Sequence, residues 1–272
     1  SDKVLFETSD GHSVETVLMR YTARNSLCVS CQIGCPLGCP ICATGQSGFV
    51  RNLSVGEIVA QVLHFARQLH AENAHLTNIV FMGMGEPMLN FDAVWNTILN
   101  LNDREGLALG ARRFTLSTAG IVPGIERLAR ESLEVGLAIS LHSPDNELRD
   151  RLVPINRQYP LESLLPAAQL YSERTGRRVT FEYALIKGLN DTDGHAQRLA
   201  ALLRNLRCYV NIIPLNPTPE CDLEPSAPET VLHFQQILVK ERIQTTVRLR
   251  RGVDIAAGCG QLRAQERSTG RE

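Results

Sequence analysis

Three cysteines in one short loop carry the most distinctive chemistry of this sequence. Cys35, Cys39 and Cys42 are separated by three and then two residues, so their thiolates can wrap around one point in space. They can hold a cubane iron–sulfur cluster that is one cysteine short of full ligation. A cluster with four thiolates transfers electrons, whereas a cluster with three keeps an open iron that can bind and reduce a substrate. The loop is therefore predicted to be catalytic.

A structural zinc ion is the alternative to a cluster as the group bound by this loop. Zinc prefers four ligands, usually as two pairs set apart in sequence, and a fourth thiolate would have to come from Cys31 or Cys28. Five of the eight cysteines lie between Cys28 and Cys42. In a chain without a secretion signal, such a group indicates metal or redox chemistry in the cytosol. We therefore favour the iron–sulfur cluster and expect a cytoplasmic protein.

Composition excludes a membrane-spanning protein and leaves the partner open. The chain has 272 residues, of which 43% are apolar and 21% charged, and its net charge is −1. Its apolar runs are only as long as a strand, so none can cross a bilayer. The net charge neither supports nor excludes a nucleic-acid partner. Arg248, Arg250 and Arg251 crowd one segment, and either a solvated face or a contact surface explains them.

The pattern of apolar residues predicts an α/β fold. Residues 1–22 have the pattern of a β-hairpin extension that turns at Asp10-Gly11. Strand-like runs then alternate with amphipathic helices, the first of which opens with a capping box of Ser54 and Glu57. Six β-α units imply a parallel sheet but are too few for a closed eight-stranded barrel, so we predict a partial (β/α)6 barrel over residues 23–264 and a disordered tail over 265–272. The predicted strands span residues 27–33, 78–84, 113–118, 136–141, 179–186 and 209–215, and the predicted helices span 54–70, 91–101, 124–130, 161–175, 192–206 and 228–241.

Small and polar residues follow several predicted strands, where open α/β barrels place their reactive groups. Glycines such as Gly85 often mark only a turn, but beside the cysteine loop they would let a ligand approach the backbone. Glu86 could then bind the ammonium of an aminoacyl ligand that chelates the open iron. His142 could be a general base, although a contact role is favoured. The predicted ligand rim consists of Gly85, Glu86, Ser117, Ser140, His142 and Asn216.

Two further cysteines are candidates for thiol chemistry. Cys259 lies between Gly258 and Gly260, which predicts an exposed thiol on a mobile backbone. Cys28 lies one strand-length before the cluster loop. Two thiols near one reaction centre can make and break a transient disulfide.

These motifs together resemble one known family, the radical S-adenosylmethionine RNA adenine methyltransferases RlmN and Cfr. The resemblance covers nearly the whole chain and implies the radical-SAM type of partial barrel. Its most specific segments are 35–42, 83–86 and 258–262. By resemblance, Cys35, Cys39 and Cys42 bind a 4Fe-4S cluster whose open iron chelates S-adenosylmethionine. The S-adenosylmethionine site implied in the same way is Gly85, Glu86, Ser117, Ser140, Leu141, His142 and Asn216.

The resemblance also implies roles for three catalytic residues. One S-adenosylmethionine methylates the thiolate of Cys259, and a second is cleaved to a radical that takes hydrogen from that methyl group. The carbon radical then adds to an amidine carbon of adenine. Cys28 assists proton removal and releases the product through a disulfide with Cys259, and Glu15 occupies the position of a proposed proton acceptor. A radical route needs a site that excludes water.

The implied substrate is carbon 2 of an adenosine in 23S rRNA, with tRNA as a second candidate. Cfr-type methylation at carbon 8, which gives antibiotic resistance, is one alternative, and a non-catalytic metal-containing RNA-binding module is another. The expected partners are RNA and a reductant such as flavodoxin, with no membrane and a monomeric state. Cys31 stands where the family usually has serine, and Gly258 where it usually has alanine. Members usually carry a further N-terminal helical domain, without which RNA affinity should be weak.

Overall fold

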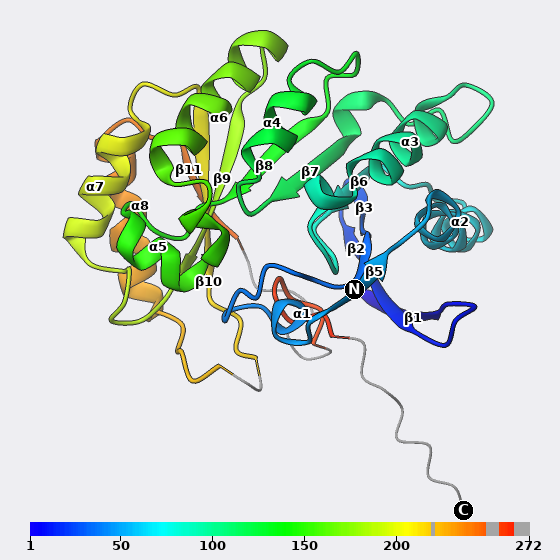
Figure 1. Cartoon of the computed structure of the whole chain (residues 1–272), viewed down its shortest axis with the longest axis horizontal. Coiled ribbons are helices and arrows are strands. Elements are labelled where there is room, and N and C mark those ends of the chain that lie inside the picture. Colours follow the sequence, from blue (N-terminus) through cyan, green and yellow to red (C-terminus); the bar gives the residue numbers. More distant parts are fainter. Residues whose placement is uncertain (219–220, 249–255, 264–272) are drawn as a thin grey trace, which may run out of the picture.

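The computed structural model describes residues 1–218, 221–248 and 256–263. One continuous sheet organises them, with helices packed along its length (Figure 1). Its strands follow the order β1-β2-β3-β6-β7-β8-β9-β10-β11. They are β1 (Asp2–Glu7), β2 (Ser13–Tyr21), β3 (Arg24–Cys28), β6 (Asn78–Phe81), β7 (Phe114–Thr118), β8 (Gly136–Ser140), β9 (Val179–Leu185), β10 (Cys208–Pro214) and β11 (Thr245–Val247).

The predicted open α/β barrel is confirmed. Strands β3 and β6 to β10 are parallel, and their connections carry the helices. The sheet stays open, since β1 and β11 form its two edges within the described residues. The helices are α1 (Ala43–Gln46), α2 (Val55–Ala71), α3 (Phe91–Asn102), α4 (Val122–Leu128), α5 (Asn146–Leu152), α6 (Leu161–Thr175), α7 (Asp193–Leu203) and α8 (Pro228–Lys240), with the 3-10 turns η1 (Pro87–Asn90), η2 (Ala111–Arg113) and η3 (Pro154–Arg157).

The N-terminal hairpin continues the main sheet. Strand β1 pairs with β2, and β2 pairs antiparallel with β3, so the hairpin extends the edge of the parallel strands. The tail predicted over 265–272 lies outside the described residues.

The structure corrects the prediction at several places. The strand predicted over 27–33 is divided, because the chain leaves the main sheet after β3. Strand β4 (Gln32–Gly34) pairs instead with β5 (Phe49–Asn52) in a separate two-stranded sheet. Helices α1 and α5 and strands β5 and β11 were not predicted. All four are short, with three to seven residues, and such short elements depend on tertiary packing more than on a periodic pattern.

Helix α2 shows how the core is built. Ile58, Val62, Phe65 and Leu69 recur at helical spacing and are each 0% exposed. Complete burial of side chains of this size stabilises the fold by about 1.5–3 kcal/mol each. The predicted capping box is present at the start of the helix, where Ser54 accepts a hydrogen bond from the Glu57 backbone N–H.

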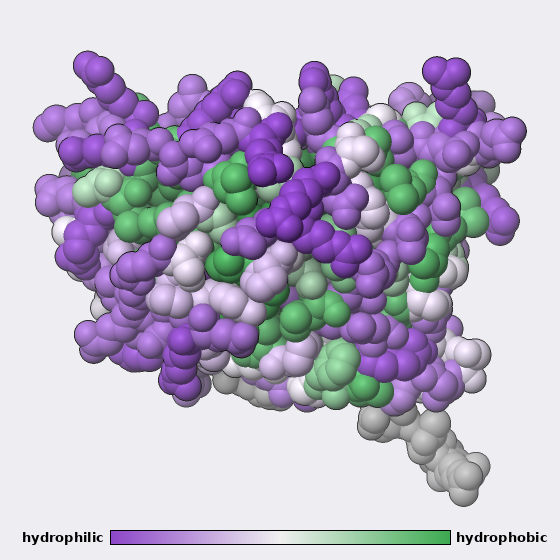
Figure 2. All heavy atoms as spheres, turned by 45° about the horizontal axis from the view of Figure 1, so that its top comes forward, coloured by the Kyte–Doolittle hydropathy of each residue, from purple (hydrophilic) through white to green (hydrophobic). Residues whose placement is uncertain are grey.

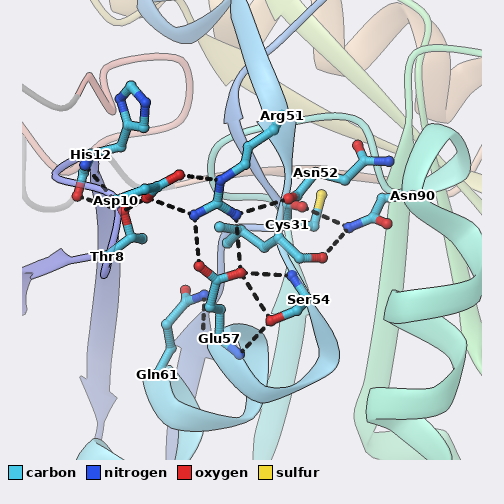
Figure 3. A network of polar contacts seen from close by, with 11 residues as sticks. Thr8, Asp10, His12, Cys31, Arg51, Asn52, Ser54, Glu57, Gln61 and Asn90 are labelled. Atoms are coloured by element: carbon cyan, nitrogen blue, oxygen red, sulfur yellow. Dashed lines mark hydrogen bonds and ion pairs between the residues drawn. The ribbon is translucent and has the colours of Figure 1, made fainter.

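One arginine joins the hairpin to this helix. The Arg51 guanidinium forms ion pairs with Asp10 in the hairpin turn, 2.7 Å away, and with Glu57 of the capping box, 2.8 Å away (Figure 3). The hydrogen bond from Arg51 lowers the pKa of Glu57 from 4.5 to about 2. The hairpin, β5 and α2 are thereby held together beside the cysteine loop.

None of the helices in the described ranges is long and apolar enough to cross a bilayer. The face in Figure 2 is mainly hydrophilic, and its hydrophobic residues form separate areas rather than a band.

Candidate active site

The cysteine loop is fixed by tight backbone geometry. It leaves β4 at Gly34, whose φ of +72° favours glycine, and an added Cβ there would lie 1.9 Å from the Gly48 carbonyl oxygen. The Cys35 N–H donates to the same carbonyl at 2.8 Å. The Cys42 N–H donates to the Cys39 carbonyl at 3.1 Å, which closes a turn between these two cysteines. Gly34 and Gly48, which the sequence alone suggests are only turn residues, therefore fix the backbone of the loop that carries the thiols.

All three thiols of the triad line one cavity of about 190 Å³. Burial raises the pKa of the Cys35 thiol to about 12 and that of the Cys39 thiol further. Within the described part of the chain, no three His, Cys, Asp or Glu side chains are close enough to hold one metal ion. Three thiols that line one cavity fit a four-iron cluster, in which each thiolate binds a different iron and one iron stays open.

Glu86 lies in the wall of the same cavity and is only 3% exposed. Its carboxylate accepts hydrogen bonds from the Met88 N–H at 3.0 Å and the Ala119 N–H at 2.8 Å. Burial outweighs these bonds and raises the pKa of Glu86 to about 7. Gly85 beside it has a φ of +101°, and a Cβ there would lie 2.5 Å from the Gln32 side chain. The site therefore holds a buried carboxyl group that a cationic ligand would keep ionised.

The remaining predicted rim residues come from the ends of three strands, β7, β8 and β10. Ser117, Ser140, His142 and Asn216 line the cavity. The Ala184 N–H donates to His142 Nδ1 at 3.0 Å, and burial lowers the pKa of His142 to about 3. This neutral imidazole suits a contact role better than proton transfer. Asn216 Oδ1 is a buried acceptor with no hydrogen-bond partner among the described residues, so it could accept a bond from a ligand.

Leu141 differs from the other predicted rim residues. Its side chain is fully buried, and it is not part of the cavity wall. Its carbonyl accepts a hydrogen bond from Arg149 Nε at 3.1 Å. Leu141 thus shapes the rim through its backbone.

Cys259 lines the same cavity as the three cluster cysteines. The segment around it is hydrogen-bonded to the cluster loop, since the Ala43 N–H donates to the Gly260 carbonyl at 2.7 Å and Thr44 Oγ1 to the Leu262 carbonyl at 2.5 Å. Asn216 Nδ2 donates to the Cys259 carbonyl at 3.0 Å. Helix α1 and residues 256–263 accordingly lie side by side in Figure 1. The thiol is half-buried rather than on the exposed, mobile backbone that the flanking glycines suggested.

Cys28 and Cys259 share a second, smaller cavity of about 40 Å³, to which Arg248 also contributes. Burial and the neighbouring Cys259 raise the pKa of Cys28 to about 12, while Arg248 opposes that rise. Arg248 itself follows β11, and its N–H donates to the Ile212 carbonyl at 2.8 Å. The two thiols predicted to react are thus neighbours, with a guanidinium close to both.

Glu15 lies outside both cavities. Its carboxylate forms an ion pair with Lys3 at 2.7 Å and accepts a hydrogen bond from the Arg263 N–H at 2.8 Å. It thereby joins the hairpin to the segment that carries Cys259. A proton-accepting role would require release from these contacts.

Sequence reasoning missed two cationic residues and one acid. Arg248 was considered only as part of an arginine-rich segment, yet it faces the thiols. Glu182 lines the main cavity from β9, and burial raises its pKa. Arg149 is fully buried behind the rim. Nothing in the sequence distinguished these three residues, because each is an ordinary charged residue until the fold buries it.

Cys31, the cysteine that precedes the triad, is also buried, and Asn90 Nδ2 donates to its carbonyl (Figure 3).

Comparisons with known proteins identify the family of this chain. Residues 29–200 match the family model of the Radical SAM superfamily. The chain is 51% identical to the ribosomal RNA large subunit methyltransferase N of Nitrosopumilus maritimus, over 96% of this chain and 76% of that protein. It is 50% identical to the dual-specificity RNA methyltransferase RlmN 1 of Myxococcus xanthus, over 96% of this chain and 73% of that protein.

A solved structure supports the same relationship. The radical SAM methyltransferase of Sphaerobacter thermophilus is 54% identical and superposes with a TM-score of 0.95, over 97% of this chain and 77% of that one. Members of the superfamily use a 4Fe-4S cluster and S-adenosylmethionine, and the thiols, Glu86 and Asn216 described above fit both. The chain therefore belongs to the Radical SAM superfamily and, within it, to the RlmN family of RNA methyltransferases.

Proposed function

We propose that this enzyme methylates carbon 2 of an adenosine in 23S rRNA, with a methyl group first carried by Cys259. The observation that carries the proposal is the shared cavity of Cys259 with Cys35, Cys39 and Cys42. A methyl carrier must reach both the bound S-adenosylmethionine and the base. The relative from Myxococcus xanthus is called dual-specificity, so we include tRNA as a second substrate.

The proposed roles follow the contacts. The triad would hold the cluster, which supplies the electron that cleaves S-adenosylmethionine, and Glu86 and Asn216 would bind its aminoacyl part. The other proposed S-adenosylmethionine contacts are Gly85, Ser117, Ser140, Leu141 and His142. Cys28, next to Cys259, would release the methylated base, and Glu15 would accept a proton once freed from Lys3. A reductant such as flavodoxin, a monomeric state and a cytoplasmic location complete the proposal.

The test is an anaerobic assay with methyl-labelled S-adenosylmethionine and either RNA, followed by mass spectrometry of the digested product. We expect 2-methyladenosine from the unaltered enzyme. Methylation at carbon 8 would show a Cfr-type enzyme and overturn the proposed position. With Cys259→Ala, cleavage of S-adenosylmethionine should persist while RNA methylation stops, and a variant that still methylates RNA would overturn the carrier role.

A matched variant tests the second thiol. Cys28→Ala should allow methyl addition but not release, so a covalent complex of protein and RNA should accumulate on denaturing gels. Cys208→Ala is the control, because Cys208 is a half-buried thiol at the start of β10, outside both cavities. Equal behaviour of the two variants would exclude the proposed role of Cys28.

A further inference from the structure

Arg149 of helix α5 is a completely buried arginine that ties the rim of the site together. It is 0% exposed. Its Nε donates to the Leu141 carbonyl at 3.1 Å, and its Nη2 donates to the Ala119 carbonyl at 2.6 Å and the Ser140 carbonyl at 3.1 Å. Its Nη1 donates to Asn156 Oδ1 at 2.6 Å. One guanidinium therefore fixes the residues that follow β7 and β8 relative to each other.

The same contacts extend to the ligand-binding carboxyl group. Ala119 accepts from Arg149 through its carbonyl and donates its N–H to Glu86 at 2.8 Å. The Glu86 N–H in turn donates to Gln32 Oε1 at 2.8 Å, and Gln32 lies in β4 just before the cysteine loop. A continuous chain of hydrogen bonds thus runs from Arg149 to the base of the loop.

Among the described residues, no carboxylate oxygen accepts a hydrogen bond from the Arg149 guanidinium. All four of its acceptors are neutral oxygens, and no ion pair within 4.0 Å joins it to another described residue. Burial lowers the pKa of Arg149 to about 10, and the charged form is supported mainly by the thiolate form of Cys39 and then by Asp150. Ala119 and Ser140, whose carbonyls accept from Arg149, line the same cavity as the three cysteines of the triad. A cluster bound there would therefore place negative charge close to this guanidinium.

We propose that Arg149 is a positioning residue that holds the S-adenosylmethionine rim and also acts as the buried counter-cation of the thiolate-bound cluster. The inference rests on the cluster at Cys35, Cys39 and Cys42. Charges in a buried site are poorly screened, so this guanidinium favours the more negative, reduced state of the cluster. Charge near an iron–sulfur centre is one of the factors that set its potential.

Three variants separate the two roles from a purely structural one. Arg149→Lys keeps the charge but cannot donate in the planar fork that reaches four acceptors. Arg149→Met removes both charge and donors. Arg151→Met removes a charge from the same helix, where Arg151 is exposed, and serves as the control.

The measurements are iron content, the redox titration of the reconstituted cluster followed by its electron paramagnetic resonance signal, and calorimetric binding of S-adenosylmethionine. For Arg149→Met, the ratio of reduced to oxidised cluster at a fixed potential should fall about tenfold, which is a negative shift of 59 mV for one electron. For Arg149→Lys, this ratio should stay within about threefold of the unaltered protein. Both variants should bind S-adenosylmethionine about tenfold more weakly, the cost of about one good hydrogen bond. Arg151→Met should change neither quantity.

A second design protects the test against a variant that fails to fold. Asn156 Nδ2 donates to Asp150 Oδ1 at 2.6 Å. The paired exchange Asp150→Asn with Asn156→Asp keeps the net charge, reverses the direction of this hydrogen bond and moves the carboxylate onto the guanidinium, although the contacts of Asn156 Nδ2 with Asn146 are lost. It should shift the potential in the negative direction while S-adenosylmethionine still binds.

The proposal fails if Arg149→Met and the paired exchange leave the potential unchanged, or if Arg151→Met shifts it equally. Undiminished S-adenosylmethionine binding by Arg149→Lys would overturn the rim role. None of these readouts uses RNA, so the outcome is separate from that of the proposed methylation.

Discussion

Replacement of Glu86 by glutamine should change how the stability of the protein depends on pH. The carboxyl group is buried, and its pKa is raised from 4.5 to about 7 by that burial. Between these two values the folded protein binds a proton that the unfolded chain has lost. Stability therefore falls as the pH rises through this window and is constant above it.

The size of the effect follows from the shift. A displacement from 4.5 to about 7 corresponds to about 3 kcal/mol, since each pKa unit is worth 1.36 kcal/mol. Glu86→Gln has no such titration. The Met88 and Ala119 N–H groups donate to different oxygens of Glu86. One of these hydrogen bonds is lost in the variant, because the NH2 group that replaces an oxygen cannot accept. That loss is a constant offset of about 1–3 kcal/mol.

The assay is urea unfolding of both metal-free proteins under reducing conditions at several values between pH 5 and pH 8. We expect the stability of the unaltered protein relative to Glu86→Gln to fall by up to about 3 kcal/mol across this range. Parallel curves for the two proteins would refute the reasoning. Binding of S-adenosylmethionine to the reconstituted protein should tighten about tenfold from pH 6 to pH 8, if its ammonium binds only the ionised carboxylate. Glu86→Gln should show weak binding without this pH dependence.

Three further variants test the structure around the site. Gly34→Ala should abolish iron incorporation, because the added Cβ would lie 1.9 Å from the Gly48 carbonyl oxygen. Iron analysis after reconstitution measures this effect, and a normal iron content would contradict the proposed loop geometry. Arg51→Met should destabilise the protein by about 1 kcal/mol at pH 7 in urea unfolding, since its ion pairs are partly exposed. That difference should shrink as the pH falls from 4.5 toward 2, because the Glu57 pKa is lowered to about 2 and protonation removes its charge; a constant difference would show that the ion pairs do not matter. Phe65→Ala should cost about 3–5 kcal/mol, since the ring is 0% exposed, and a loss below 1 kcal/mol would mean that the core relaxes around it.

The sequence alone predicted most of the candidate chemistry of this protein. Cys35, Cys39 and Cys42 lie within eight residues of each other in the chain, so their shared environment follows from local spacing. The long periodic segments, such as α2, also follow from sequence, because their burial pattern repeats over several turns. The placement of polar residues at strand ends followed from the rule that parallel strands end on one side of a sheet.

Tertiary structure alone decided which distant residues meet. The hydrogen bonds from Ala43 and Thr44 bring Cys259 to the cluster loop, and the strand order places Cys28 beside it. Tertiary structure also places Arg149 and Arg248 near the thiols. Their charges act on the site because folding buries both guanidinium groups. Spacing along a chain fixes short-range geometry, whereas burial and the field between charges depend on every element packed around them.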